Sequence, residues 1–221
     1  MKLFLLNVHL LSLSAAIGSM IIAEHFILRR VVFGKAFGQD IYAVIKYSST
    51  VIASSLILLW ISGAGFLYIG YQADPLYITN EKIWAKVTIV LLISINGLYV
   101  HRALLPRLQE VSQGSAFVQT SLESALLRLS FSVSTAGWLA AVFLGSARFL
   151  NEGYEYWLLL VPYLSVVFQI WLLSYVVCRD KPNVKWHQPA ESTILVSVSK
   201  APSWKQISEL GVEKDERSRG L

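Results

Sequence analysis

Residues 48–70 read SSTVIASSLILLWISGAGFLYIG and contain no charged side chain. A helix of about 20 apolar residues is long enough to cross the hydrocarbon core of a bilayer, which is about 30 Å thick. The segment has that length, and its apolar residues form one block, whereas a helix on a soluble core carries them at spaced positions. It therefore predicts a transmembrane helix.

Blocks of the same kind lie on both sides of this segment. The sequence predicts an all-α, polytopic membrane helix bundle in which residues 1–178 form the transmembrane domain. Its five helices are expected at about 3–28, 48–70, 83–103, 129–150 and 156–178. The composition agrees with this class, because 15% of the 221 residues are charged, against about a quarter in a soluble domain.

The first block also has features of a signal peptide, since Lys2 precedes a Leu-rich stretch. It is too long for that role, it contains His9 and the pair Glu24-His25, and two arginines follow it. We therefore expect it to remain in the protein as the first transmembrane helix.

The formal net charge of +5 comes from Lys and Arg residues between the blocks. This distribution is typical of membrane helices and argues against nucleic-acid binding, so the expected partner is the lipid bilayer. The first and third connections are basic, whereas the second and fourth carry Asp74, Glu81, Glu152 and Glu155. Because basic loops stay in the cytoplasm, we expect the amino terminus outside and the polar tail, 179–221, as a flexible cytoplasmic segment.

Ionisable side chains within these helices are costly in lipid, so each is a candidate for function. His9 and Glu24 on the first helix have the same spacing as Lys86 and His101 on the third. That spacing is about 22 Å along a helix, and the two helices run in opposite directions. If they are neighbours, His9 lies at the depth of Lys86 and Glu24 at that of His101. Two polar stations are predicted, one near each membrane face.

The outer station, His9 and Lys86, has the chemistry of a cofactor site. A neutral imidazole can bind haem iron or another metal, and the Lys86 ammonium could pair with a carboxylate such as a porphyrin propionate. Haem b is therefore the candidate cofactor. The alternative is that Lys86 extends to the outer headgroups and that His9 bonds a backbone carbonyl.

The inner station, Glu24 with His101 and His25 nearby, is a candidate proton relay. The alternative is an interfacial ion pair close to Arg29 and Arg102.

Metal-ligand motifs are absent from the sequence. Cys178 is the single cysteine, so neither an intrachain disulfide nor a CxxC pair is possible. No HExxH motif, phosphate loop or GxSxG motif is present. Small residues instead recur at helical spacing, as in Gly137, Ala141 and Gly145, which predicts close helix packing.

Several short runs look familiar: Val8-His9-Leu10, Leu28-Arg29-Arg30, Ser62-Gly63-Ala64-Gly65, Trp84-Ala85-Lys86, Asn96-Gly97 and His101-Arg102-Ala103-Leu104-Leu105-Pro106. Over residues 1–110 they resemble a loose bacterial group that is similar to the CopD-type copper-resistance membrane proteins and the HemJ-type protoporphyrinogen oxidases. The resemblance implies a multi-pass protein of the cell inner membrane in which a helix-one histidine and a helix-three lysine matter. Those positions are His9 and Lys86.

Three classes of function stay open. The first is a haem-binding or redox-linked membrane protein. The second is a copper-handling or small-solute transport protein, although two methionines and four histidines are few for copper passage and no internal repeat typical of secondary transporters is present. The third is an accessory or assembly subunit without chemistry of its own, acting as a homo-oligomer or within a larger membrane complex.

Overall fold

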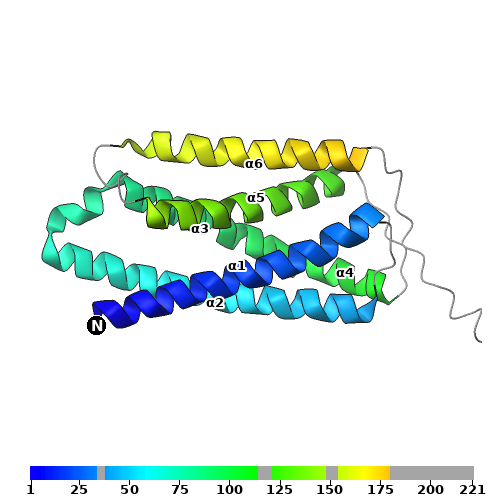
Figure 1. Ribbon diagram of the computed structural model, residues 1–221, viewed down its shortest axis with the longest axis horizontal. Coiled ribbons are helices and arrows are strands. Elements are labelled where there is room, and N and C mark those ends of the chain that lie inside the picture. Colours follow the sequence, from blue (N-terminus) through cyan, green and yellow to red (C-terminus); the bar gives the residue numbers. More distant parts are fainter. Residues whose placement is uncertain (34–37, 114–120, 148–153, 180–221) are drawn as a thin grey trace, which may run out of the picture. The chain divides into compact units, whose positions relative to one another are not determined.

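The computed structural model describes residues 1–33, 38–113, 121–147 and 154–179, and these form helices without any strand. All of them belong to one compact unit, Met1–Trp186. In chain order the elements are α1 (Lys2–Phe33), α2 (Gln39–Ala73), the 3-10 helix η1 (Pro75–Thr79), α3 (Glu81–Tyr99), the π-helix η2 (Val100–Leu104), α4 (Leu105–Ser112), α5 (Ser121–Ser146) and α6 (Tyr156–Arg179) (Figure 1). The predicted tail beyond residue 179 lies outside the described residues.

The predicted all-α membrane bundle is confirmed. Five stretches within the described ranges are long and apolar enough to cross a bilayer: Lys2–Arg30, Gln39–Ala73, Glu81–Ser112, Leu122–Ser146 and Tyr156–Val177. Large apolar side chains point outward from them, and Leu11 is 71% exposed, Phe168 61% and Leu173 64%. A soluble surface rarely carries so much contiguous apolar area, so these side chains are suited to contact with acyl chains.

The helices extend beyond their apolar blocks, which were the basis of the predicted bounds. The second predicted helix begins at Gln39 instead of 48, and the fourth predicted helix, which is α5, begins at Ser121 instead of 129. Hydropathy locates the part of a helix that meets lipid, whereas backbone hydrogen bonding continues into the more polar turns on either side.

The third span is one helix interrupted by a π-turn. The Leu105 N–H donates to the carbonyl of Val100, five residues back, and α4 then continues through Pro106. Proline lacks an N–H and is tolerated in a first helical turn. The wider turn thus absorbs Pro106 and lets the helix run to Ser112, well past the predicted end at 103.

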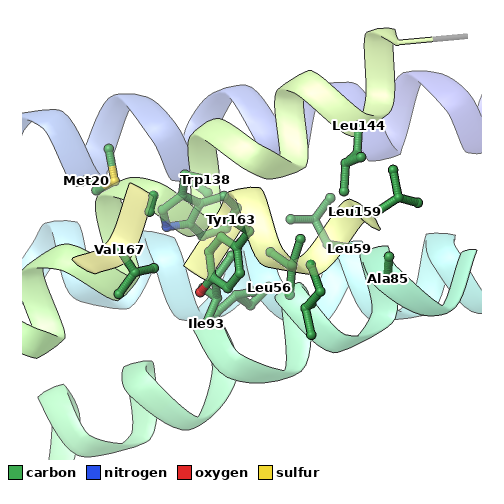
Figure 2. Packing of buried hydrophobic residues seen from close by; sticks show 14 of the residues in the cluster. Met20, Leu56, Leu59, Ala85, Ile93, Trp138, Leu144, Leu159, Tyr163 and Val167 are labelled. Carbon is green, nitrogen blue, oxygen red and sulfur yellow. The ribbon is translucent and has the colours of Figure 1, made fainter. Parts of the chain in front are cut away.

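The main core lies between α1, α2, α3, α5 and α6. Figure 2 shows Trp138 and Tyr163 among Ile93, Leu56 and Met20 in this cluster. Gly137 lies at the contact between α5 and α3, where a Cβ atom would come within 2.6 Å of the Ile93 side chain. The predicted small-residue contact is therefore present there. Gly145, on the same predicted stripe, faces open space.

A second, smaller core joins α2 and α4. Ile41 and Ile45 of α2 pack with Leu105, Leu108 and Val111 of α4. Beside this core the Tyr42 hydroxyl donates to the side-chain oxygen of Gln109, at 3.0 Å. These contacts hold together the helix turns that extend beyond the apolar blocks.

The two ends of the bundle are tied by different contacts. At one end Tyr42 meets Gln109, and Arg107 pairs with Glu123 at 2.5 Å. At the opposite end the backbone N–H of Tyr156 donates to the Glu81 carboxylate. The first and third connections therefore share one end, and the second and fourth share the other, as expected from the alternating loop charges.

Candidate functional site

The predicted outer station begins with a histidine held between two antiparallel helices. α1 lies beside α2 (Figure 1), and the Nδ1 atom of His9 is 2.8 Å from the hydroxyl of Ser62. Phe66, one turn along α2, meets the imidazole edge-on with ring centroids 5.6 Å apart. The helices approach closely here because Gly65 has no side chain, and a Cβ atom there would lie 2.8 Å from Leu5.

The hydrogen bonds of Ser62 indicate which nitrogen of the His9 imidazole carries the hydrogen that faces it. The hydroxyl is 2.6 Å from the Leu58 carbonyl oxygen and 3.2 Å from that of Leu59, and Ser62 is 1% exposed. A serine has one hydroxyl hydrogen, and the short distance to Leu58 requires that hydrogen to point there. Ser62 must then accept from His9, whose Nδ1 carries the proton. In the neutral imidazole, the Nε2 atom of His9 then carries the lone pair.

Lys86 lies on the same side of the bundle. Its ammonium is half-buried on α3 and lies within electrostatic range of the His9 ring. The two predicted outer-station residues, from α1 and α3, thus interact electrostatically without a hydrogen bond between them, while α2 supplies Ser62. Their role in binding stays a prediction.

A second lysine, which sequence reasoning missed, accompanies this station. Lys82 lies one turn before Lys86, is 4% exposed, and donates through Nζ to the Ala147 carbonyl oxygen at 2.5 Å. Its spacing of four residues from Lys86 was the available signal. It was overlooked because the apolar block of the third helix begins one residue later, at 83.

The predicted inner station is divided between two places. The Glu24 carboxyl contacts α5, where Thr135 lies 3.1 Å from both of its oxygens and Ser134 also forms a hydrogen bond with it. His101, in the π-turn, lies 3.3 Å from the Ser49 carbonyl oxygen. Glu24 and His101 therefore have separate hydrogen-bond partners. His25 is exposed and packs edge-on against its neighbour Phe26.

Sequence reasoning missed the hydroxyl partners of Glu24. Ser134 and Thr135 belong to a run of small polar residues, Ser-Val-Ser-Thr, in the middle of α5. Such hydroxyls usually bond the carbonyl four residues back in their own helix, so nothing in the sequence distinguishes those that also serve another helix.

No group of three or more His, Cys, Asp or Glu side chains able to hold a metal ion occurs within the described ranges. The side chain of Cys178, and all of His187, lie outside those ranges.

By its fold and its intramembrane polar residues the chain is a multi-pass helical membrane protein. Compared with models of known families, with curated proteins and with solved structures, it matches none.

Proposed function

We propose that this protein binds haem b in the outer half of a bacterial inner membrane, with His9 as the residue that would hold the iron, and that it takes part in redox chemistry there. The observation that supports this most is the chain of hydrogen bonds from His9 through Ser62 to Leu58. It directs the proton to Nδ1 and leaves Nε2 as a free donor for iron.

The residues fit the group in three respects. A histidine that ligates iron characteristically donates its other ring N–H to an oxygen nearby, which sets its orientation and raises its basicity. Ser62 is that oxygen for His9. Lys86 supplies a cation that can pair with a propionate, and the Phe66 ring packs against the imidazole and limits its rotation.

Among the described residues, His9 is the histidine with the hydrogen bonding suited to an iron ligand. His25, the next histidine along α1, is sixteen residues beyond His9, which corresponds to about 24 Å, and His101 contacts Ser49 instead. We therefore expect a single histidine of this chain on the iron. Haem would supply one-electron chemistry. The protein would hold the iron through His9, balance one carboxylate through Lys86 and surround the group with apolar helices.

An absorbance spectrum tests the proposal. The protein is purified in mild detergent from cells supplied with a haem precursor, and haem is also added to the purified protein. We expect a Soret band in the native protein, loss of at least 90% of it in His9→Ala, and a weakened or shifted band in Ser62→Ala.

His25→Ala is the matched control, since it removes an exposed histidine from the same helix, and it should keep the native spectrum. A folded native protein that stays colourless after haem is added contradicts the proposal. So does a His9→Ala variant with an unchanged band. Copper found by metal analysis of the colourless protein would favour copper handling, and co-purification of a defined complex would favour an accessory subunit.

A further inference from the structure

The Glu24 carboxyl lies against the middle turns of α5, although Glu24 itself is toward the inner end of α1. Its partner Thr135 is 14 residues after the first residue of α5, Ser121, and 11 before the last, Ser146. At 1.5 Å per residue these separations are about 21 Å and about 17 Å. The carboxyl therefore lies against the middle turns of α5 and not at either of its ends.

Charged groups on α1 itself do not pair with this carboxyl. His25 is exposed and packs on Phe26, and Arg29 and Arg30 lie five and six residues closer to the inner end. Arg107 and Glu123 form an ion pair between described residues. Glu24 forms no ion pair with any of the described residues.

Between described residues, no cation of the neighbouring helices forms an ion pair with Glu24, whose side-chain hydrogen-bond partners are hydroxyls of α5. The charged or titratable groups of these helices toward the inner half make other contacts: Lys46 of α2 lies over the ring of Tyr42, Arg128 of α5 lies over the ring of Tyr175, and His101 of η2 meets the Ser49 carbonyl. A bare carboxylate in these surroundings would be costly.

The hydroxyl of Thr135 can satisfy the carboxyl in either protonation state. Its Oγ1 atom is 2.9 Å from the Phe131 carbonyl oxygen and 3.1 Å from each oxygen of Glu24. A threonine has one hydroxyl hydrogen. When that hydrogen points to Phe131, Oγ1 accepts the proton of a neutral Glu24. When it turns toward Glu24, it donates to a carboxylate.

We propose that Glu24, with Thr135 and Ser134, forms a proton-binding site between α1 and α5. In the resting state the carboxylic acid donates its O–H to Thr135, which donates to Phe131. On release the proton passes to water, and the hydroxyls of Thr135 and Ser134 then donate to the carboxylate. The site is independent of haem and would let the bundle take up and release one proton within its membrane-spanning part.

A hydrophobic carbodiimide tests this site in the full chain in detergent or vesicles. Only a protonated carboxyl in an apolar place reacts: its oxygen bonds to the carbodiimide carbon, its proton moves to nitrogen, and the acyl group then migrates to the other nitrogen. The product gains one intact carbodiimide. We expect the label on the peptide containing Glu24, and we expect labelling to decrease as pH rises, because the carboxylate does not react.

The controls separate proton binding from a structural role. Glu24→Gln, which resembles the neutral acid in shape, should fold and lose the label, whereas Glu81→Gln, at the end of α3, should keep it. A Thr135→Val variant should keep an infrared carbonyl band of a protonated acid but at higher frequency, since the acid loses its hydrogen-bond partner.

Three results would overturn the proposal. The first is a folded native protein in which Glu24 stays unlabelled at every pH. The second is equal labelling by a water-soluble carbodiimide, which would place the carboxyl in water. The third is labelling that does not change with pH.

Discussion

Hydroxyls on neighbouring helices set the hydrogen bonding of two partly buried ionisable groups of α1, His9 and Glu24. Ser62 and Thr135 each bond the carbonyl four residues back in their own helix, and each also contacts a group on α1. Because a hydroxyl has one hydrogen and can accept others, the intrahelical bond decides what is left for the partner. For this reason the neutral imidazole of His9 carries its proton on Nδ1. The Glu24 carboxyl has a hydrogen-bond partner both when it is protonated and when it is ionised.

At this scale the sequence indicated candidate functional groups and missed their hydrogen-bond partners. His9, Lys86 and Glu24 could be recognised because ionisable residues are rare in apolar blocks. Ser62 and Thr135 could not, since serine and threonine are common in membrane helices and their importance depends on which helix lies opposite. The expected pairing of Glu24 with His101 assumed that α1 faces the inner half of the third span, whereas Glu24 faces α5.

The buried hydroxyl of Tyr163 is predicted to be dispensable. Within the described part of the chain it has no hydrogen-bond partner, although Tyr163 is 4% exposed. An unsatisfied buried hydroxyl costs stability, so Tyr163→Phe should leave the free energy of unfolding unchanged or raise it by about 1 kcal/mol. Unfolding in mixed micelles with increasing denaturing detergent measures this.

Tyr156→Phe is the matched control. The Tyr156 hydroxyl lies 2.9 Å from the Thr88 hydroxyl, so its removal should lower the free energy of unfolding by about 1 kcal/mol. A loss of stability in Tyr163→Phe equal to that in Tyr156→Phe would mean that the Tyr163 hydroxyl does have a partner.

Helix elements differ from their apolar blocks wherever a turn has protein contacts outside the lipid. The first turns of α2 and all of α4 exist because Ile41, Ile45 and Leu108 bury one another. Sequence periodicity is weak over such short segments, and a hydropathy average over a long window does not detect them. The continuation through Pro106 could not be foreseen either, because it depends on the π-turn before it.

The small core between α2 and α4 is predicted to hold α4 in place by itself. Leu108 is 9% exposed, and Leu108→Ala should cost about 2–5 kcal/mol, as large-to-small changes in a core do. Hydrogen exchange followed by mass spectrometry should then show faster exchange of the α4 amides, with the amides of α5 and α6 unaffected.

Leu98→Ala serves as the comparison, since Leu98 lies on the same span and is 50% exposed. It should leave exchange in α4 unchanged. Equal acceleration in both variants, or in neither, would contradict a separate core at this end.

The whole molecule alternates its connections between two ends. Tyr42 with Gln109, and Arg107 with Glu123, join the residues next to the basic connections, whereas Glu81 with Tyr156 joins those next to the acidic ones. The loop charges and the side-chain contacts are independent observations, and both indicate that successive connections lie at alternate ends of the bundle. The five-helix count follows from both, and the side assigned to the cytoplasm follows from the positive-inside rule.

Cysteine accessibility in intact cells tests this topology most directly. In a Cys178→Ser background, single cysteines replace Lys46, Gln109, Asp74 or Glu155, and a membrane-impermeant thiol reagent is added before or after permeabilisation. We predict labelling of the Asp74 and Glu155 positions in intact cells, and of the Lys46 and Gln109 positions only after permeabilisation. Labelling of Lys46 and Asp74 positions from the same side would contradict five lipid-embedded helices.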